Sequence, residues 1–504
     1  MVAADVGAQG IRQVVIVGGG TAGWMTAAAL SRYLQGGQCK IVLVESEEIG
    51  TVGVGEATIP SITKFHRSLG LDEGAFLATT GATFKLGIEF VDWLERGDRY
   101  FHPFGLLGRD VDGIAFYQIY LRLMAEKRSA ELERYAPCSV AAAAGRFGTP
   151  QRPIRVPSGG FPHAYHFDAT RYAQLLRSYA EQRGVLRLEG RVVDTSLSAS
   201  GDVDSILLAN SEEVAGDLFI DCTGSRALLI GGALDVGYID WKHYLPCDRA
   251  VVAPTANTDE ALPYTRATAK GAGWQWRIPL QHRVGNGYVY SGEYSTDEEA
   301  EKIFVSGLGG DCLDPPRIIR FRTGRREKFW HRNVVSIGIS AGFLEPLEST
   351  SIHLIQTGIS RILSLFPGRN LHESLRKEYN RSMAQAFDGV RDFVTLHYKL
   401  TSRDDTPFWR YVRNMPVPDT LRERIELFRE TGRFVRDENE LFSQESWITV
   451  MLGQGVRPRA YSALADAISI DRLEAAASGI REQIQHAVSA LPLSKDYLAA
   501  VSRN

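Results

Sequence analysis

The sequence predicts an α/β fold: a Rossmann-type β-α-β unit, then an antiparallel sheet, then a mainly helical part. Three observations predict it. A glycine-rich turn at residues 18–24 follows a short apolar run and opens an alanine-rich segment. Polar and apolar residues alternate between turn signals over residues 185–224, and helical periodicity dominates from about residue 355.

Each element has a local reason. The apolar runs predict buried strands, and the helices are marked by 3.6-residue periodicity and terminal glycines. The expected elements are a strand over 13–17, a helix over 21–34, a strand over 39–45, a strand end and helix over 162–184, a meander over 185–224 and a strand over 333–340. No repeat or low-complexity linker interrupts them. We therefore predict a core over residues 11–355, with substrate-facing insertions around 85–140, and a helical substrate-side module over 356–504 packed on it.

Composition limits the classes of partner. The chain has 504 residues, of which 44% are hydrophobic and 23% charged, enough for two or three packed cores. Its net charge of -3 offers no field that attracts nucleic acid or an anionic membrane. Five cysteines without C-x-x-C spacing indicate no metal site and fit a reduced, cytoplasmic setting. The N-terminus lacks the order of a secretory signal, and no apolar run is long enough to span a bilayer.

The turn after the first strand has the spacing of a dinucleotide site. Gly18, Gly20 and Gly23 form G-x-G-x-x-G, and Glu45 ends the next strand, where an acid accepts ribose hydroxyl groups. The order of the later strands resembles the FAD-binding aromatic monooxygenase fold rather than a nicotinamide dehydrogenase. Where that fold usually has a Gly-Asp pair, this chain reads Gly338-Ile339-Ser340.

Three further segments resemble the flavin-dependent halogenase family typified by tryptophan halogenases. They are "GWQWRIP", "TFKLGIEF" and "GISAGFLEPLESTSIH". The stretches "TVGVGEATIP", "HAYHFDATRYA" and "RDFVTLHYKLTSRDDTPFWRYVRNM" extend the resemblance over nearly the whole chain. It implies an oxidoreductase in which reduced FAD, supplied by a separate flavin reductase, forms hypohalous acid from oxygen and chloride or bromide. A homodimer is one possible assembly.

The resemblance also implies roles for particular residues. Lys85 and Glu348, together with Ser349 next to Glu348 in the sequence, are the implied catalytic residues. A lysine activates hypohalous acid by hydrogen bonding or as an N-halo amine, and a carboxylate stabilises the cationic arenium intermediate and removes its proton. The implied FAD-binding residues are Gly18, Gly19, Gly20, Thr21, Ala22, Gly23, Glu45, Val52, Gly53, Val54, Gly55, Ala57, Val192, Gly224, Ile339 and Ile352.

The resemblance implies a halide site, a substrate pocket and a flavin-side wall as well. Backbone N–H groups of Thr350 and Ser351 would bind halide, although the family usually has glycine at the second position. His102 and Phe104 would sandwich an indole ring. A flavin-side wall of Trp274, Trp276, Ile278 and Pro279 would keep organic substrate away from the flavin.

The region after residue 431 indicates which kind of substrate the protein binds. Relatives that accept free tryptophan usually carry a tyrosine pair and an acid that bind the amino-acid backbone, but here the region reads "GRFVRDENELFSQESWITVMLGQG". A zwitterion needs polar partners when it is desolvated. We therefore expect an indole derivative or another electron-rich arene, with Phe442 and Trp447 both candidates for a further stacking ring.

Each feature also has an alternative interpretation. Alone, Lys85 would be read as a solvated surface residue, Glu348 as an acid at a helix N-terminus and Ser349 as an N-cap. For the whole chain, the alternatives are a flavin-dependent aromatic hydroxylase and a non-catalytic protein that keeps the FAD fold to bind a partner.

Overall fold

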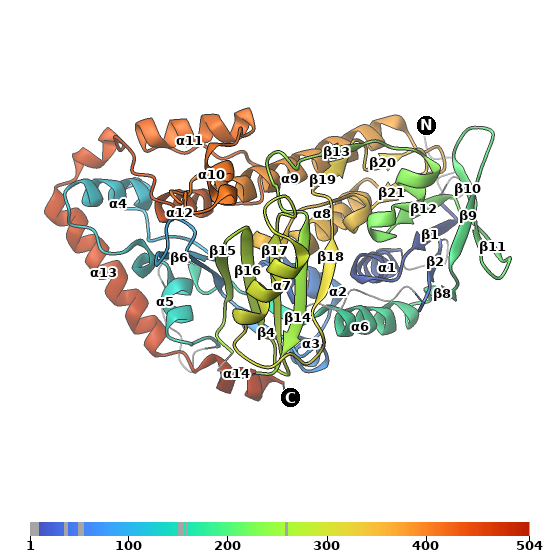
Figure 1. Cartoon of the computed structure of the whole chain (residues 1–504), viewed down its shortest axis with the longest axis horizontal. Coiled ribbons are helices and arrows are strands. Elements are labelled where there is room, and N and C mark those ends of the chain that lie inside the picture. Colours follow the sequence, from blue (N-terminus) through green and yellow to red (C-terminus); the bar gives the residue numbers. More distant parts are fainter. Residues whose placement is uncertain are drawn as a thin grey trace, which may run out of the picture.

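The predicted α/β architecture is confirmed. The computed structural model describes residues 10–34, 39–48, 55–149, 156, 159–257 and 261–502. Figure 1 shows the parallel sheet and the N-terminal helix α1 at one end of the molecule, an antiparallel sheet in the middle and a group of helices at the other end.

The β-α-β unit opens a six-stranded sheet. Its order is β20 (Trp330–His331), β21 (Val334–Ser336), β12 (Leu218–Asp221), β1 (Gln13–Val17), β2 (Lys40–Glu45) and β8 (Leu186–Glu189). Strands β2 and β12 both pair with β1 in parallel, so α1 (Thr21–Tyr33) begins at the carboxyl end of the central strand. Val14, Val15 and Ile16 are fully buried, which explains the continuous apolar run of β1.

The meander forms only in part as expected. Strands β9 (Val192–Leu197), β10 (Val203–Leu208) and β11 (Glu213–Ala215) make a separate antiparallel sheet. The strands on either side of them, β8 and β12, belong to the parallel sheet instead. Alternation of polar and apolar residues predicts strands, but it does not say which sheet they join.

The remaining strands surround the middle of the molecule. A seven-stranded sheet has the order β18 (Arg317–Arg320), β14 (Arg249–Thr255), β17 (Val284–Tyr290), β16 (Gly273–Pro279), β15 (Thr265–Lys270), β5 (Gly87–Val91) and β6 (Arg99–Pro103). One small sheet has the order β3 (Gly55–Ala57), β7 (Ala164–Asp168) and β4 (Thr83–Lys85). A second small sheet has the order β13 (Tyr238–Asp240), β19 (Gly324–Arg326) and β22 (Gly342–Phe343).

The helices cover both ends of these sheets. The α-helices besides α1 are α2 (Ser61–Leu69), α3 (Glu73–Thr80), α4 (Phe116–Ala125), α5 (Pro137–Ala143), α6 (Ala169–Glu181), α7 (Asp297–Ser306), α8 (Ser351–Ser364), α9 (Glu373–Lys399), α10 (Pro407–Asn414), α11 (Asp419–Thr431), α12 (Gln444–Gly453), α13 (Ile470–Ser489) and α14 (Ser494–Val501). The division expected between residues 355 and 356 falls within α8. One large hydrophobic cluster includes buried residues from both sides of it, for example Val14 and Leu473.

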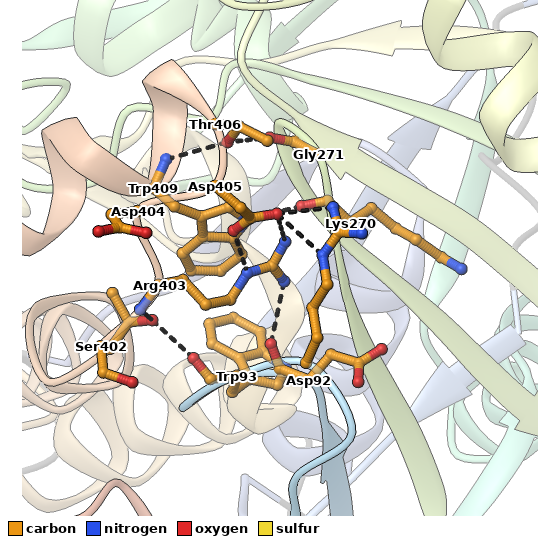
Figure 2. Close-up of polar contacts among 12 residues, drawn as sticks. Asp92, Trp93, Lys270, Gly271, Ser402, Arg403, Asp404, Asp405, Thr406 and Trp409 are labelled. Carbon is orange, nitrogen blue, oxygen red and sulfur yellow. Dashed lines mark hydrogen bonds and ion pairs between the residues drawn. The ribbon is translucent and has the colours of Figure 1, made fainter.

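A buried arginine joins α9 and α10 to two turns of the central sheet. Figure 2 shows Arg403 between Asp405 and the turn at Asp92. Its guanidinium donates to both carboxylate oxygens of Asp405 and to the carbonyl of Asp92, and it stacks 4.4 Å from the Trp409 ring. Trp409 Nε1 donates to the Lys270 carbonyl at 2.7 Å. The segment after α9 is therefore fixed to the β5–β6 and β15–β16 turns.

The two arginines that bind the Asp405 carboxylate should differ in how much they contribute to the free energy of unfolding. Arg403→Met should lower the free energy of unfolding by about 2–3 kcal/mol, because its side chain is 4% exposed and its guanidinium bonds Asp405 and the Asp92 carbonyl while it stacks on Trp409. Arg96 also binds Asp405, at 2.6 Å, but its side chain is 71% exposed. Arg96→Met should cost less than about 1 kcal/mol. Denaturant unfolding of both variants checks the ranking, and equal losses would contradict it.

Candidate active site

The buried amine of Lys85 hydrogen-bonds to Ser349. Lys85 ends β4, which pairs with β7, and Thr83 on the same strand donates a hydrogen bond to the Pro279 carbonyl of β16 at 2.6 Å. The Lys85 side chain is fully buried, and Nζ donates to Ser349 Oγ at 2.7 Å. Nζ also lies 5.4 Å from the centre of the Phe104 ring. The amine therefore has a fixed position inside the protein.

Burial changes the acid–base chemistry of this amine. Loss of solvation lowers the pKa of Lys85 to about 7, and the negative charge of Glu348 opposes this shift. An unperturbed lysine would be almost entirely cationic at neutral pH. At neutral pH this site therefore contains both the ammonium, which donates hydrogen bonds, and the free amine, which is a nucleophile.

Glu348 lies between two imidazoles. His102 Nδ1 is 3.1 and 3.0 Å from the two carboxylate oxygens of Glu348. His397 Nε2 is 2.8 Å from Glu348 Oε1, but the geometry of this contact does not meet that of a hydrogen bond. Burial alone raises the pKa of this carboxyl group. The two histidines outweigh burial and hold the pKa at about 2, so the side chain is an ionised carboxylate.

His397 connects Glu348 to further buried polar groups. Its Nδ1 is 2.7 Å from the Tyr100 hydroxyl group, and Gln454 Nε2 donates to the His397 carbonyl at 2.8 Å and lies 3.5 Å from that hydroxyl. Burial lowers the pKa of His397, which favours a neutral ring. Nδ1 shares a hydrogen bond with the Tyr100 hydroxyl group, and Nε2 faces Glu348. Sequence reasoning missed His397, although it lies in the "RDFVTLHYKL" stretch.

Ser349 separates Glu348 from α8. It has a left-handed backbone with φ of 59°, and Thr350 is the N-cap residue of the helix. Thr350 is 1% exposed, and its Oγ1 has no hydrogen-bond partner among the described residues. The first N–H groups of α8, including that of Ser351, have no acceptor within the helix. They form a positive helix end directly beside Ser349.

Aromatic rings surround the carboxylate. His102 lies on β6 and Phe104 just after it, and both approach the Lys85–Glu348 region. The His102 ring is 5.6 Å from Phe393 of α9. Phe393 in turn stacks on Phe442 at 3.7 Å and meets Trp447 edge-on at 4.9 Å. Both sequence candidates for a stacking ring thus pack on Phe393, which sequence reasoning did not identify.

The two tryptophans of β16 are close, as their spacing predicts. Trp274 and Trp276 have ring centres 5.9 Å apart and are 1% and 7% exposed, and Ile278 and Pro279 complete the strand. Trp274 Nε1 donates to Glu345 Oε1 at 2.9 Å. The wall is therefore joined to the segment that contains Glu348.

Glu345 differs from Glu348 in its surroundings. It is fully buried and accepts from Trp274 and from the Tyr398 hydroxyl group, the latter at 2.6 Å. No histidine binds it, and its Oε2 has no hydrogen-bond partner among the described residues. Burial raises its pKa to about 7. Two glutamates three positions apart therefore have opposite protonation behaviour.

The glycine-rich turn has the shape of a pyrophosphate cradle. Gly18 has a φ of 110°, and a Cβ atom there would lie 2.3 Å from the Cys222 carbonyl oxygen. A Cβ atom on Gly23 would lie 1.8 Å from the Gly18 carbonyl oxygen. Gly20 is the N-cap of α1, with no atom within 4 Å of where its Cβ would be. Backbone can approach a ligand closely here, at the positive end of a helix.

The acid of the dinucleotide site is in place at the end of β2. Glu45 Oε1 accepts from Arg187 at 2.5 Å and Oε2 from Trp24 Nε1 at 3.2 Å. Each oxygen keeps a second lone pair that can accept a ribose hydroxyl group. The glycine turn, the helix end and this acid fit FAD.

The other implied FAD-binding residues lie around this cradle or at the central sheet. A Cβ atom on Gly338 would lie 2.8 Å from Ala22, and the neighbouring Ile339 is 49% exposed, unusual for a large apolar side chain. The remaining positions are Gly19 and Thr21 in the turn, Gly55 and Ala57 on β3, Val192 on β9, Gly224 after β12, and Ile352 on α8. Val52, Gly53 and Val54 lie outside the described residues.

The described residues contain neither a metal-binding cluster nor a membrane-spanning helix. No group of three or more His, Cys, Asp or Glu side chains is arranged to hold a metal ion in this part of the chain. Likewise, none of the described helices is long and apolar enough to cross a membrane.

Known proteins resemble this chain in sequence and in fold. A profile of the tryptophan halogenase family matches residues 13–470. Tryptophan 6-halogenase SttH of Streptomyces toxytricini is 37% identical over 528 residues, covering 97% of this chain and 98% of the relative. A solved flavin-dependent halogenase from Xanthomonas campestris is 46% identical with a TM-score of 0.94, covering 98% of this chain and 99% of that one. BrvH, a flavin-dependent halogenase from Brevundimonas sp. BAL3, is 44% identical with a TM-score of 0.93, covering 97% and 99%.

These matches agree with the site. Family and fold coincide over almost the full chain, and the segments that the family shares contain the glycine cradle, the buried lysine and the carboxylate between two histidines. The chain therefore belongs to the tryptophan halogenase family and is a flavin-dependent halogenase that acts on an aromatic substrate.

Proposed function

We propose that the chain is a two-component, FADH2-dependent halogenase that halogenates an indole derivative rather than free tryptophan. The observation that carries this proposal is the buried cluster of Lys85, Ser349 and Glu348 beside the His102 and Phe104 rings. An amine, a carboxylate and flat aromatic surfaces in one place suit electrophilic substitution of an electron-rich ring.

The residues have separate roles in this proposal. Lys85 receives hypohalous acid, and its ammonium hydrogen-bonds the oxygen so that the halogen becomes more electrophilic. Glu348 stabilises the positive charge that develops on the ring and accepts the ring proton, while His102 and His397 hold the carboxylate ionised. Ser349 fixes Nζ of Lys85.

The cofactor has a separate chamber in this proposal. The Gly18–Gly23 turn and Glu45 would hold FAD, which when bound in reduced form supplies the chemistry that makes hypohalous acid from oxygen and halide. A separate flavin reductase would provide reduced FAD. The α8 N-terminus, through the N–H groups of Thr350 and Ser351, would bind chloride or bromide. The β16 wall would exclude the arene from the flavin.

The aromatic region favours a substrate without an amino-acid tail. Residues 433–454 contain no tyrosine pair. The acid there, Glu440, accepts through Oε1 from Arg424 at 2.5 Å and from Trp447 Nε1 at 3.0 Å, while its Oε2 has no hydrogen-bond partner among the described residues. The ammonium and carboxylate groups of free tryptophan would need several polar partners if they were buried in this region. Their desolvation would therefore make the binding of free tryptophan unfavourable.

The Lys85 pKa predicts a pH dependence. If the ammonium donates the activating hydrogen bond, the fraction of hypohalous acid converted to product should fall as pH rises through about 7, where the amine loses its proton. An N-halo amine needs the neutral amine, so its yield would fall as pH decreases instead. The measurement is halogenated product per reduced flavin consumed, from pH 6 to 9. A yield without an inflection near neutrality would contradict a role for either form.

The substrate proposal is tested by comparing two arenes in separate incubations. The protein, FAD, a flavin reductase, NADH, oxygen and bromide are incubated with indole or with tryptophan, and halogen isotope patterns are read by mass spectrometry. A hypohalite scavenger removes oxidant that escapes into solution. We expect brominated indole and little brominated tryptophan, and a preference for tryptophan would overturn the substrate proposal.

A further inference from the structure

A pocket lies next to Gln454, which donates to the His397 carbonyl. It has a volume of about 490 Å³ and is formed by the C-terminal end of α9, by α10 and α11, and by the segment after α12. Five of its lining side chains are basic: Lys399, Arg413, Arg429, Arg457 and Arg459. We name it the cationic pocket.

The positive charge of this pocket is mostly unbalanced. No acidic residue lines it. Of the described carboxylates, Glu430 pairs with Arg459 at 2.8 Å and Asp404 approaches Arg413 at 3.9 Å, both on exposed side chains, where such pairs are screened by solvent. The structure describes no carboxylate within 4 Å of the other three basic groups. Five clustered cations repel one another, so an anion between them would be attracted.

Backbone carbonyls hold two of these cations in position. Lys399 Nζ donates to the Met415 carbonyl at 2.7 Å, and Arg457 Nη1 donates to the Leu452 carbonyl at 2.7 Å. Partial burial lowers the pKa of Lys399. These side chains are therefore ordered before any ligand arrives, which reduces the entropy cost of binding.

The wall and floor of the pocket are also fixed. Ser402 donates through its backbone to the Leu94 carbonyl at 3.0 Å, and both residues line the pocket beside the Arg403 junction of Figure 2. The floor contains Gln454, which is 2% exposed. Its Nε2 is occupied, but Oε1 has no hydrogen-bond partner among the described residues. Gln454 therefore closes this side of the pocket as a buried side chain held by the His397 carbonyl.

We propose that the cationic pocket binds a small, multiply charged oxyanion, with two or more phosphate or carboxylate groups. The volume suits a small molecule. The lining contains no aromatic side chain, so it lacks the stacking surfaces with which proteins bind bases of single-stranded nucleic acid. This site is separate from the FAD cradle and from the Lys85 chamber, and its existence does not depend on the proposed substrate.

Calorimetry with pyrophosphate and with citrate tests the proposal on the full-length protein at low salt, saturated with FAD so that the glycine-rich turn is occupied. We expect saturable binding to the wild type that weakens as salt increases. Arg429→Gln combined with Arg459→Gln should weaken binding at least about tenfold, because two of the five charges are removed. Arg369→Gln combined with Arg32→Gln removes the same charge outside the pocket and should change affinity less than about twofold.

Two results would overturn the proposal. One is the absence of saturable binding of both anions to the wild type at concentrations up to about 10 mM, which corresponds to a free energy too small for a specific site. The other is equal weakening in the two double variants, which would mean that net charge rather than the pocket attracts the anion. Thermal unfolding of both variants checks that the fold is retained.

Discussion

Lys85→Ala should abolish halogenated product while the oxidation of reduced flavin continues. The lysine is proposed to act after hypohalous acid has formed, so its removal should not slow the flavin reaction. A loss of at least about 1000-fold is expected, because the variant lacks both the activating hydrogen bond and the fixed position of the oxidant. Product is measured by mass spectrometry and flavin oxidation by absorbance.

The fate of the oxidant separates this prediction from a general loss of folding. With Lys85→Ala, hypohalous acid should escape and be recovered by a scavenger in proportion to the product lost. Lys85→Met keeps most of the side-chain volume and should behave in the same way. Ser349→Ala keeps the amine but removes its partner at 2.7 Å, so we expect a smaller loss of about tenfold. Wild-type product yield from Lys85→Ala would refute the assignment of this residue.

The elements set by local pattern could be predicted from the sequence. Strand β1 has the expected bounds of residues 13–17, and β2 and α1 differ from expectation by one residue. Here a buried apolar run is followed by glycines that allow a positive φ and a close backbone approach. The pairing of β8 with β2 could not be predicted, because it depends on contacts between strands that are far apart in the sequence.

The same limit applies to the site. Lys85, Glu348, Ser349, His102 and Phe104 come from segments that resemble known halogenases, and the structure brings them together. His397 and Phe393 were missed. They lie one turn apart on α9, and a helix of 27 residues has many such pairs. Only the packing of α9 on β6 shows which pair faces the carboxylate.

Environment also decides protonation, which the sequence does not encode locally. Glu345 and Glu348 belong to the same short segment, "EPLEST", yet burial raises the pKa of one to about 7 while two histidines hold the other at about 2. This contrast provides a matched pair of substitutions. Glutamine has nearly the shape of a protonated glutamic acid but never carries the negative charge.

Glu348→Gln should lower the rate of halogenation by about 100- to 1000-fold, because the positive charge on the arene loses its fixed anion and the ring proton loses its acceptor. Glu345→Gln should change the rate by less than about threefold at pH 6.5, since the native side chain is already mostly protonated there and the amide oxygen still accepts from Trp274 and Tyr398. Single-turnover experiments with supplied reduced flavin compare the two variants with the wild type. Equal losses in both would mean that the segment acts through its shape and packing rather than through the charge on residue 348.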